Sequence, residues 1–166
     1  MALQRKVAAE VANDTVQLKR VYQATVEQVY QAWTNPDSLN TWFGPQSHTS
    51  KVEKFDLREG GRYQIRMIPT GEESDCTGDS NEDSVCAGQF VKLVPNKSLI
   101  MTFNWIEGGA DMGETLVSIE IQSTSNGTEM ILTHERIPSN ELRTAHSAGW
   151  ESSLDCLEAY IQQENS

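Results

Sequence analysis

Residues 139–163 read SNELRTAHSAGWESSLDCLEAYIQQ, and this stretch decides the fold. Ser139 is suited to cap a helix, and side chains that fit one buried face then recur every three or four residues. These side chains are Leu142, Ala145, His146, Gly149, Trp150, Leu154, Leu157, Tyr160 and Ile161. The pattern predicts one long amphipathic helix with a broad apolar face that needs a partner.

Six consecutive strands are predicted before this helix. Alternating apolar and polar side chains, bounded by turn residues, mark residues 50–57, 62–68, 85–94, 98–105, 114–123 and 128–136. The connection Ser125-Asn126-Gly127 is a strong hairpin signal between the last two. Such a run of neighbouring strands favours an antiparallel sheet with one apolar face.

The sequence of residues 16–45 predicts a strand followed by two short helices. Residues 16–24 alternate and read as the strand. A capping box at residues 25–28 begins the first helix, and Asn35-Pro36 begins the second, which ends at Gly44-Pro45. With the later elements, this order predicts an α+β fold in which a curved antiparallel sheet of six or seven strands wraps around the long C-terminal helix.

A cavity between the sheet and the long helix is the next expectation. Aromatic residues make up only 7% of the chain, which is little bulk with which to fill the space under a curved sheet. Gaps of this kind are typical ligand sites. We expect a single domain over residues 15–164, preceded by an N-terminal arm at residues 1–14.

Charge and composition exclude several classes of partner. The net charge is −11, so the chain is unsuited to nucleic acid or an anionic membrane surface. No apolar stretch is long enough to cross a membrane, and the N-terminus has no apolar signal region, so we expect a cytoplasmic protein. Residues 70–84 contain six acids and no base, which predicts a flexible acidic loop.

The cysteines and acids give no metal or cofactor signal. Cys76, Cys86 and Cys156 are expected to be reduced thiols, with a disulfide between the first two as the alternative. No His/Cys set has zinc spacing, and the acidic loop lacks the glycine and the final glutamate of a calcium loop. We therefore expect neither a metal nor a cofactor.

Five motifs in order carry a resemblance to a known family. They are residues 24–33 (ATVEQVYQAW), residues 35–45 (NPDSLNTWFGP), residues 56–63 (DLREGGRY), residues 132–135 (LTHE) and residues 149–157 (GWESSLDCL). Together they resemble the SRPBCC superfamily, the helix-grip fold of the birch pollen allergen and the START lipid-transfer domains. Within it, they are most similar to the C-terminal domain of the activator of heat shock protein 90 ATPase. The resemblance covers about residues 16–163, and the acidic segment at 70–84 departs from the shorter hairpin of that family.

Residues on the predicted inner faces are the candidate ligand contacts. They are Tyr63, Met67, Met101, Phe103, Trp105, Met130, His134, His146 and Trp150, with Trp42 as a gate at the cavity mouth. The alternative for Trp150 and His134 is a buried core role, and for Trp42 a seal beneath the short helices. If both histidines face inward, they could meet and form a polar site.

Catalytic motifs are nearly absent, so we expect non-catalytic binding of a small hydrophobic molecule. The resemblance leaves two alternatives open. One is a co-chaperone-like module that binds and stimulates a heat-shock ATPase. The other is an enzyme of the cyclase or dehydratase type, because some helix-grip proteins catalyse such reactions.

Overall fold

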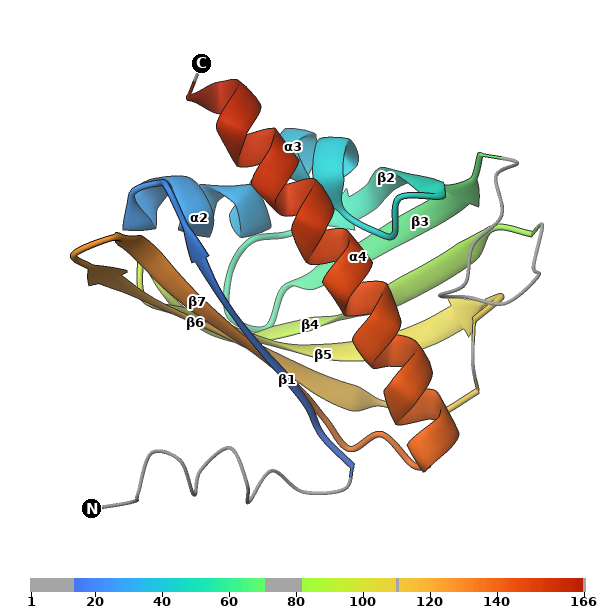
Figure 1. Cartoon of the computed structure of the whole chain (residues 1–166). Coiled ribbons are helices and arrows are strands. Elements are labelled where there is room, and N and C mark those ends of the chain that lie inside the picture. Colours follow the sequence, from blue (N-terminus) through green and yellow to red (C-terminus); the bar gives the residue numbers. More distant parts are fainter. Residues whose placement is uncertain (1–13, 71–81, 110, 166) are drawn as a thin grey trace.

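The computed structural model describes residues 14–70, 82–109 and 111–165 (Figure 1). The elements follow in the order β1 (Val16–Tyr22), α2 (Val26–Thr34), α3 (Pro36–Trp42), β2 (His48–Phe55), β3 (Arg62–Pro69), β4 (Ser84–Val94), β5 (Ser98–Glu107), β6 (Thr115–Thr124), β7 (Gly127–Glu135) and α4 (Asn140–Glu164). The predicted α+β helix-grip fold is confirmed, and the described residues form a sheet of seven strands.

The sheet is antiparallel throughout, with the order β1-β7-β6-β5-β4-β3-β2. Sequence neighbours pair along most of it, but β1 pairs with β7, so Val16 lies opposite His134. The sheet curls, and α4 crosses its concave face (Figure 1). The two edge strands of the sheet are β1 and β2, and α3 packs against β2.

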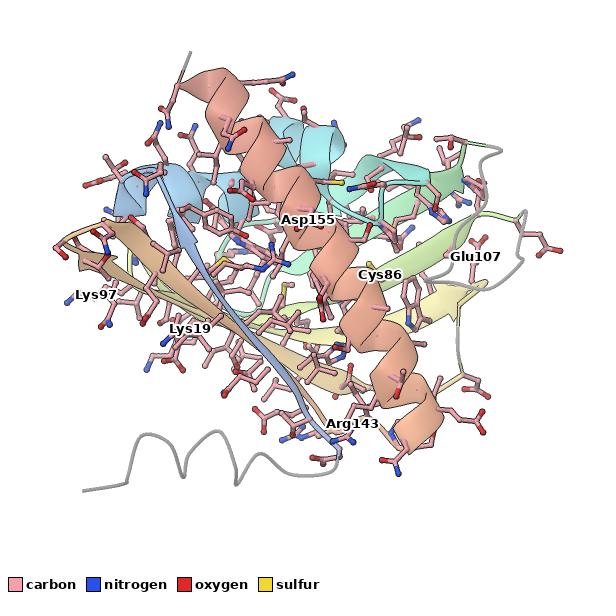
Figure 2. The ribbon with its side chains drawn as sticks, viewed as in Figure 1. Lys19, Cys86, Lys97, Glu107, Arg143 and Asp155 are labelled. Carbon is pink, nitrogen blue, oxygen red and sulfur yellow. The ribbon has the colours of Figure 1, made fainter. Side chains whose placement is uncertain are left out.

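Two sequence expectations lie mostly outside the described residues. The predicted N-terminal arm, residues 1–14, is undescribed over residues 1–13, and the predicted acidic loop, residues 70–84, is undescribed over residues 71–81, which include Cys76. Cys86 is a buried free thiol on β4, between α4 and the sheet, and its burial raises the pKa to about 12 (Figure 2). The proton therefore stays on this thiol at neutral pH.

The two short helices close one end of the concave face. Figure 1 shows α2 and α3 beside the C-terminal half of α4, and the hydroxyls of Ser38 and Tyr160 lie 2.8 Å apart across this contact. Trp33 and Leu39 are buried beneath the helices. The apolar side chains of both helices recur at helical spacing and therefore pack on the core. The two predicted helix starts, at Thr25 and Asn35, are where these helices begin.

Replacing Thr25 with alanine is expected to lower the free energy of unfolding by about 1 kcal/mol. The Thr25 hydroxyl accepts a hydrogen bond from the backbone N–H of Gln28 at 3.1 Å, and the Gln28 side chain accepts one from the backbone N–H of Thr25 at 3.0 Å. Urea denaturation measures the change. The control is Thr41→Ala on the exposed side of α3, which should change stability by less than about 0.5 kcal/mol.

The helix α4 is anchored by its side chains from Trp150 onward. Trp150, Ser153, Leu154, Leu157 and Ile161 are its buried side chains. In the first half, Leu142 and His146 are only half-buried, and Ala145, which the pattern placed on the inner face, is exposed. The first half of α4 is thus covered less completely than the rest, and a hollow of about 550 Å³ lies beside it, lined by Arg143 and Ser147 of α4 and by the start of β1.

Candidate functional site

The predicted ligand contacts lie on the inner side of the sheet or on the face of α4 that meets it, and the predicted gate, Trp42, lies on α3. Alternation along the strands explains this, because Phe103 and Trp105 share a face of β5, as Met130 and His134 share a face of β7. Trp105 and His146 are half-buried. The buried ones are Trp42, Tyr63, Met67, Met101, Phe103, Met130, His134 and Trp150.

The structure brings the two histidines together. Their ring centroids lie 5.5 Å apart, with the rings nearly perpendicular. His134 comes from β7 and His146 from the first half of α4, so the contact joins the sheet to the helix. The Phe103 ring lies 5.1 Å from that of His134, which encloses the pair in aromatic surface.

The hydrogen bonds of His134 determine where its proton lies. The indole N–H of Trp150 donates to Nδ1 at 3.0 Å, so Nδ1 is an acceptor. Nε2 lies 2.7 Å from the hydroxyl of Thr115, which itself donates to the carbonyl oxygen of Phe103 at 2.8 Å. Because the hydroxyl proton is already used in that hydrogen bond, the hydroxyl oxygen can only accept from the ring. Nε2 therefore carries the imidazole proton and donates a hydrogen bond to Thr115.

His146 has the opposite tautomer. The indole N–H of Trp105 donates to Nε2 at 3.0 Å, and Nδ1 lies 2.8 Å from the carbonyl oxygen of Leu142 one turn earlier. A carbonyl only accepts, so the proton is on Nδ1. Each histidine therefore accepts one hydrogen bond from a tryptophan indole and donates one to an oxygen atom.

Burial keeps both imidazoles neutral. It lowers the pKa of His134 to about 3, with a smaller contribution from the nearby His146, and it also lowers the pKa of His146. No carboxylate in the described part of the chain forms a hydrogen bond or ion pair with either ring. The arrangement resembles a satisfied buried network more than an acid–base pair poised for catalysis.

Other predicted contacts lie further from the histidines. The indole N–H of Trp42 donates to the carbonyl oxygen of Ala32 at 2.9 Å, and its ring packs on Trp33 and Phe43 with centroids 4.8 and 5.6 Å away. Tyr63 packs on Phe90 and its hydroxyl donates to the carbonyl oxygen of Thr102 at 2.7 Å. Burial raises the pKa of Tyr63 well above its usual value.

The sequence reasoning missed several members of the site. Thr115 shares its face of β6 with Val117, so the same alternation could have placed it inward. Met112 is buried but lies in a glycine-rich connection, where no periodicity exists to place it. Phe43 follows α3 directly and packs on Trp150, with ring centroids 6.0 Å apart.

A charged cluster lies at another place on the sheet. The guanidinium of Arg66 on β3 contacts the carboxylates of Glu53 at 2.7 Å, Asp83 at 3.3 Å and Glu107 at 3.5 Å. These contacts raise the pKa of Arg66, and hydrogen bonds from Arg66 and Gln64 lower the pKa of Glu53. The cluster ties β2, β3, β4 and β5 together at one end.

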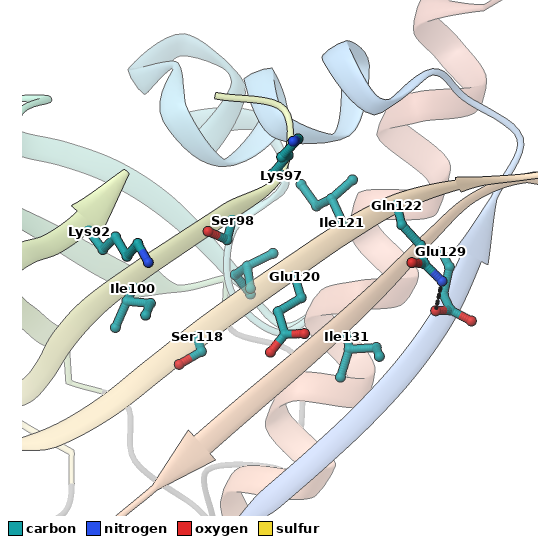
Figure 3. Close-up of a pocket in the computed structure, with 11 residues that line it drawn as sticks. Lys92, Lys97, Ser98, Ile100, Ser118, Glu120, Ile121, Gln122, Glu129 and Ile131 are labelled. Carbon is teal, nitrogen blue, oxygen red and sulfur yellow. Dashed lines mark hydrogen bonds between the residues drawn. The ribbon is translucent and has the colours of Figure 1, made fainter. Parts of the chain in front are cut away.

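The described residues include no group of three or more histidine, cysteine or acidic side chains placed to hold a metal. Among them, no helix combines the length and apolar character needed to cross a membrane. A hollow of about 410 Å³ lies on the outer side of the sheet, between Lys92, Glu120 and Ile131 (Figure 3). Neither this hollow nor the one beside β1 is lined by a predicted ligand contact.

Comparison with protein families gives a match over residues 23–162 to the family described as activator of Hsp90 ATPase homolog 1-like protein. The chain belongs to this family. The match spans every element from the first short helix to α4, so it includes both indole–imidazole pairs. No curated protein sequence matches the chain.

Several solved structures of other proteins have the same fold as this chain. A protein from Chromobacterium violaceum is 27% identical, with a TM-score of 0.77, over 89% of this chain and 97% of that one. The AHSA1 protein from Silicibacter pomeroyi is 21% identical, with a TM-score of 0.75, over 90% and 99%. A protein from Nitrosomonas europaea is 24% identical, with a TM-score of 0.72, over 93% and 97%.

Proposed function

We propose that this protein binds a small, mainly apolar molecule between the concave face of the sheet and α4, without chemical conversion. The observation that carries the proposal is that every buried polar side-chain atom in the described residues already has a hydrogen-bond partner. A polar ligand would therefore bury groups that find no partner, and that costs binding free energy. An apolar ligand bears no such cost.

The apolar residues of the interior support the same function. Four methionines are buried there: Met67, Met101, Met112 and Met130. Methionine side chains are unbranched and polarizable, so they can repack around ligands of different shape. Burying apolar ligand surface contributes roughly 25 cal/mol per Å² before the costs of association.

The hydrogen bonds of the histidines favour binding over catalysis. A general base needs a free lone pair within reach of substrate, and a general acid needs a proton that it can give up. The Nδ1 lone pair of His134 and the Nε2 lone pair of His146 are both occupied by indole donors. Neither imidazole is available for proton transfer while those bonds stand, so the cyclase or dehydratase alternative has less support.

Native mass spectrometry of the protein purified from its own host is expected to show a copurifying small molecule that organic extraction removes. Returning the extract should raise the melting temperature, since a ligand at one hundred times its Kd stabilises the fold by about 2.7 kcal/mol. Neighbouring residues on opposite faces of β5 locate the site. Met101→Ala on the inner face should change the affinity, and Ile100→Ala on the outer face should not. The reverse result would place the ligand on the outer surface and contradict the proposal.

Chaperone activation is a second candidate function, because the matching family is named for it. A purified heat-shock ATPase supplies the discriminating measurement. An ATP hydrolysis rate that rises with the concentration of this protein would favour activation. An unchanged hydrolysis rate would contradict activation and leave ligand binding as the proposed function. Loss of stimulation on reversing the charge of an exposed acid outside the Arg66 cluster, for example Glu114→Lys, would identify the contact as electrostatic.

A further inference from the structure

The half of the interior around Trp105 and His146 is less completely buried than the rest. Both side chains are half-buried, whereas Phe103, His134 and Trp150 are each at most 6% exposed. All of the buried side chains of α4 lie from Trp150 onward. This region is therefore where solvent, and hence a ligand, comes nearest to the aromatic cluster.

Trp105 is also held by fewer contacts than Trp150. The Trp150 ring packs against Trp33, Phe43 and Phe103, with centroids 6.0 to 6.3 Å away. The Trp105 ring meets Phe103 edge-on at 5.2 Å, and its hydrogen bond goes to the half-buried His146. Of the two tryptophans, Trp105 is the one that can leave its place with the smaller loss of packing.

A glycine connection lies against the Trp105 ring. A Cβ atom on Gly109 would lie 2.5 Å from the indole, and Gly108, Gly109 and Gly113 all have positive φ angles of 48° to 72°. The backbone thus fits directly on the ring, and no side chain of Gly109 blocks it. The Trp105 ring is therefore covered on this side by the backbone of Gly109 and not by a side chain.

The tautomer of His146 specifies what could replace the indole. Its Nδ1–H is committed to the carbonyl oxygen of Leu142, so Nε2 remains an acceptor aimed at the Trp105 position. If Trp105 left and only apolar surface took its place, this nitrogen would lose its partner inside the protein. A replacing molecule that brings a donor restores this hydrogen bond, whereas a purely apolar one does not, so the geometry favours a ligand with a donor.

We propose that the Trp105 side chain occupies a ligand position and that the molecule which displaces it is flat and aromatic, with one neutral O–H or N–H donor for Nε2 of His146. This inference rests on the proposed binding function and names the chemical class of its ligand. The donor is neutral, because the groups around His146 are the neutral imidazole of His134 and the indole of Trp105, with no opposite charge to pair a buried cation.

Two probes of matched shape test the inference: 2-naphthol, which has one hydroxyl donor, and naphthalene, which has none. In the wild-type protein, 2-naphthol should move the indole N–H resonance of Trp105, assigned by its loss in Trp105→Phe. In Trp105→Ala, calorimetry should give at least tenfold tighter binding of 2-naphthol than in the wild type, since no side chain competes for the position. Trp105→Val, whose small side chain leaves most of the position open, serves if the alanine variant does not fold.

The donor requirement is tested on the same variants. Trp105→Ala should bind 2-naphthol about tenfold more tightly than naphthalene, and adding His146→Leu should abolish that preference. Ile106→Ala, the adjacent and outward-facing residue at 48% exposure, is the matched control and should leave both affinities unchanged.

Each contrary result has a distinct meaning. Equal binding of the two probes to Trp105→Ala overturns the inference but leaves apolar binding intact. Binding of 2-naphthol to the wild type with the Trp105 resonance unmoved also overturns it. Failure of both probes to bind either the wild type or Trp105→Ala counts against the inference and the proposed function together, whereas binding of the copurified host molecule would still support the function.

Discussion

Replacing Trp150 with alanine is expected to lower the free energy of unfolding by about 3–5 kcal/mol, as is typical when a buried aromatic side chain is removed from a core. Trp150 is 6% exposed and packs against Trp33, Phe43 and Phe103. The substitution also leaves Nδ1 of His134 without its donor, which adds a desolvation cost. Guanidinium denaturation with an unchanged m-value would measure the loss.

Two variants separate the contributions of packing and hydrogen bonding. Trp150→Phe keeps most of the ring but removes the N–H, so it should cost about 1–3 kcal/mol for the unpaired imidazole nitrogen. Glu151→Ala, at the exposed neighbouring position, should change stability by less than about 0.5 kcal/mol. A loss below about 1 kcal/mol for Trp150→Ala would contradict the placement of this side chain in the core.

Acidification is expected to destabilise the protein through His134. Burial lowers the pKa of His134 to about 3 in the folded state, and the unfolded chain has the ordinary value of 6.5. Between those values the unfolded state binds a proton that the folded state refuses. The contribution is therefore complete above about pH 6.5 and declines as the pH falls, by roughly 1.4 kcal/mol for each pH unit in that window. His146, whose pKa is also lowered, acts in the same direction.

Comparing the wild type with His134→Asn isolates this effect. The asparagine carbonyl can still accept from Trp150, and the side chain does not titrate. Chemical denaturation at about pH 7.5, 6 and 5 should show a shallower decline of unfolding free energy in the variant than in the wild type. Other groups with lowered pKa values, among them His48 and Glu53, titrate in both proteins and cancel in the comparison. Parallel pH profiles would mean that His134 is not held neutral.

The elements could be predicted from the sequence because their signals are local. The capping box at Thr25 and the Asn35-Pro36 start are both present as hydrogen-bonded helix ends. The alternation that placed His134 beside Met130 and Leu132 correctly gave its inward direction. The inward position of His146 followed from helical spacing in the same way.

What could not be predicted depends on distances between elements. Nothing in the local sequence pairs Trp105 on β5 with His146 on α4, because the partners are brought together only by the way the helix crosses the sheet. Ala145 fits the helical stripe but is exposed, because the period of a helix does not reveal how much of its length the sheet covers. Met112 lies in an irregular segment, where no period identifies a buried side chain.

The pairing of β1 with β7 sets the order in which the chain can acquire its native structure. During synthesis on the ribosome, β1 emerges early and has no native neighbour until residues 127–135 follow. Joining such distant segments requires closing a long loop, which slows folding relative to helical proteins of similar size. Until β7 and α4 have been synthesised, the growing chain exposes the apolar side chains of the concave face of the sheet. The chain is most prone to aggregation during that interval.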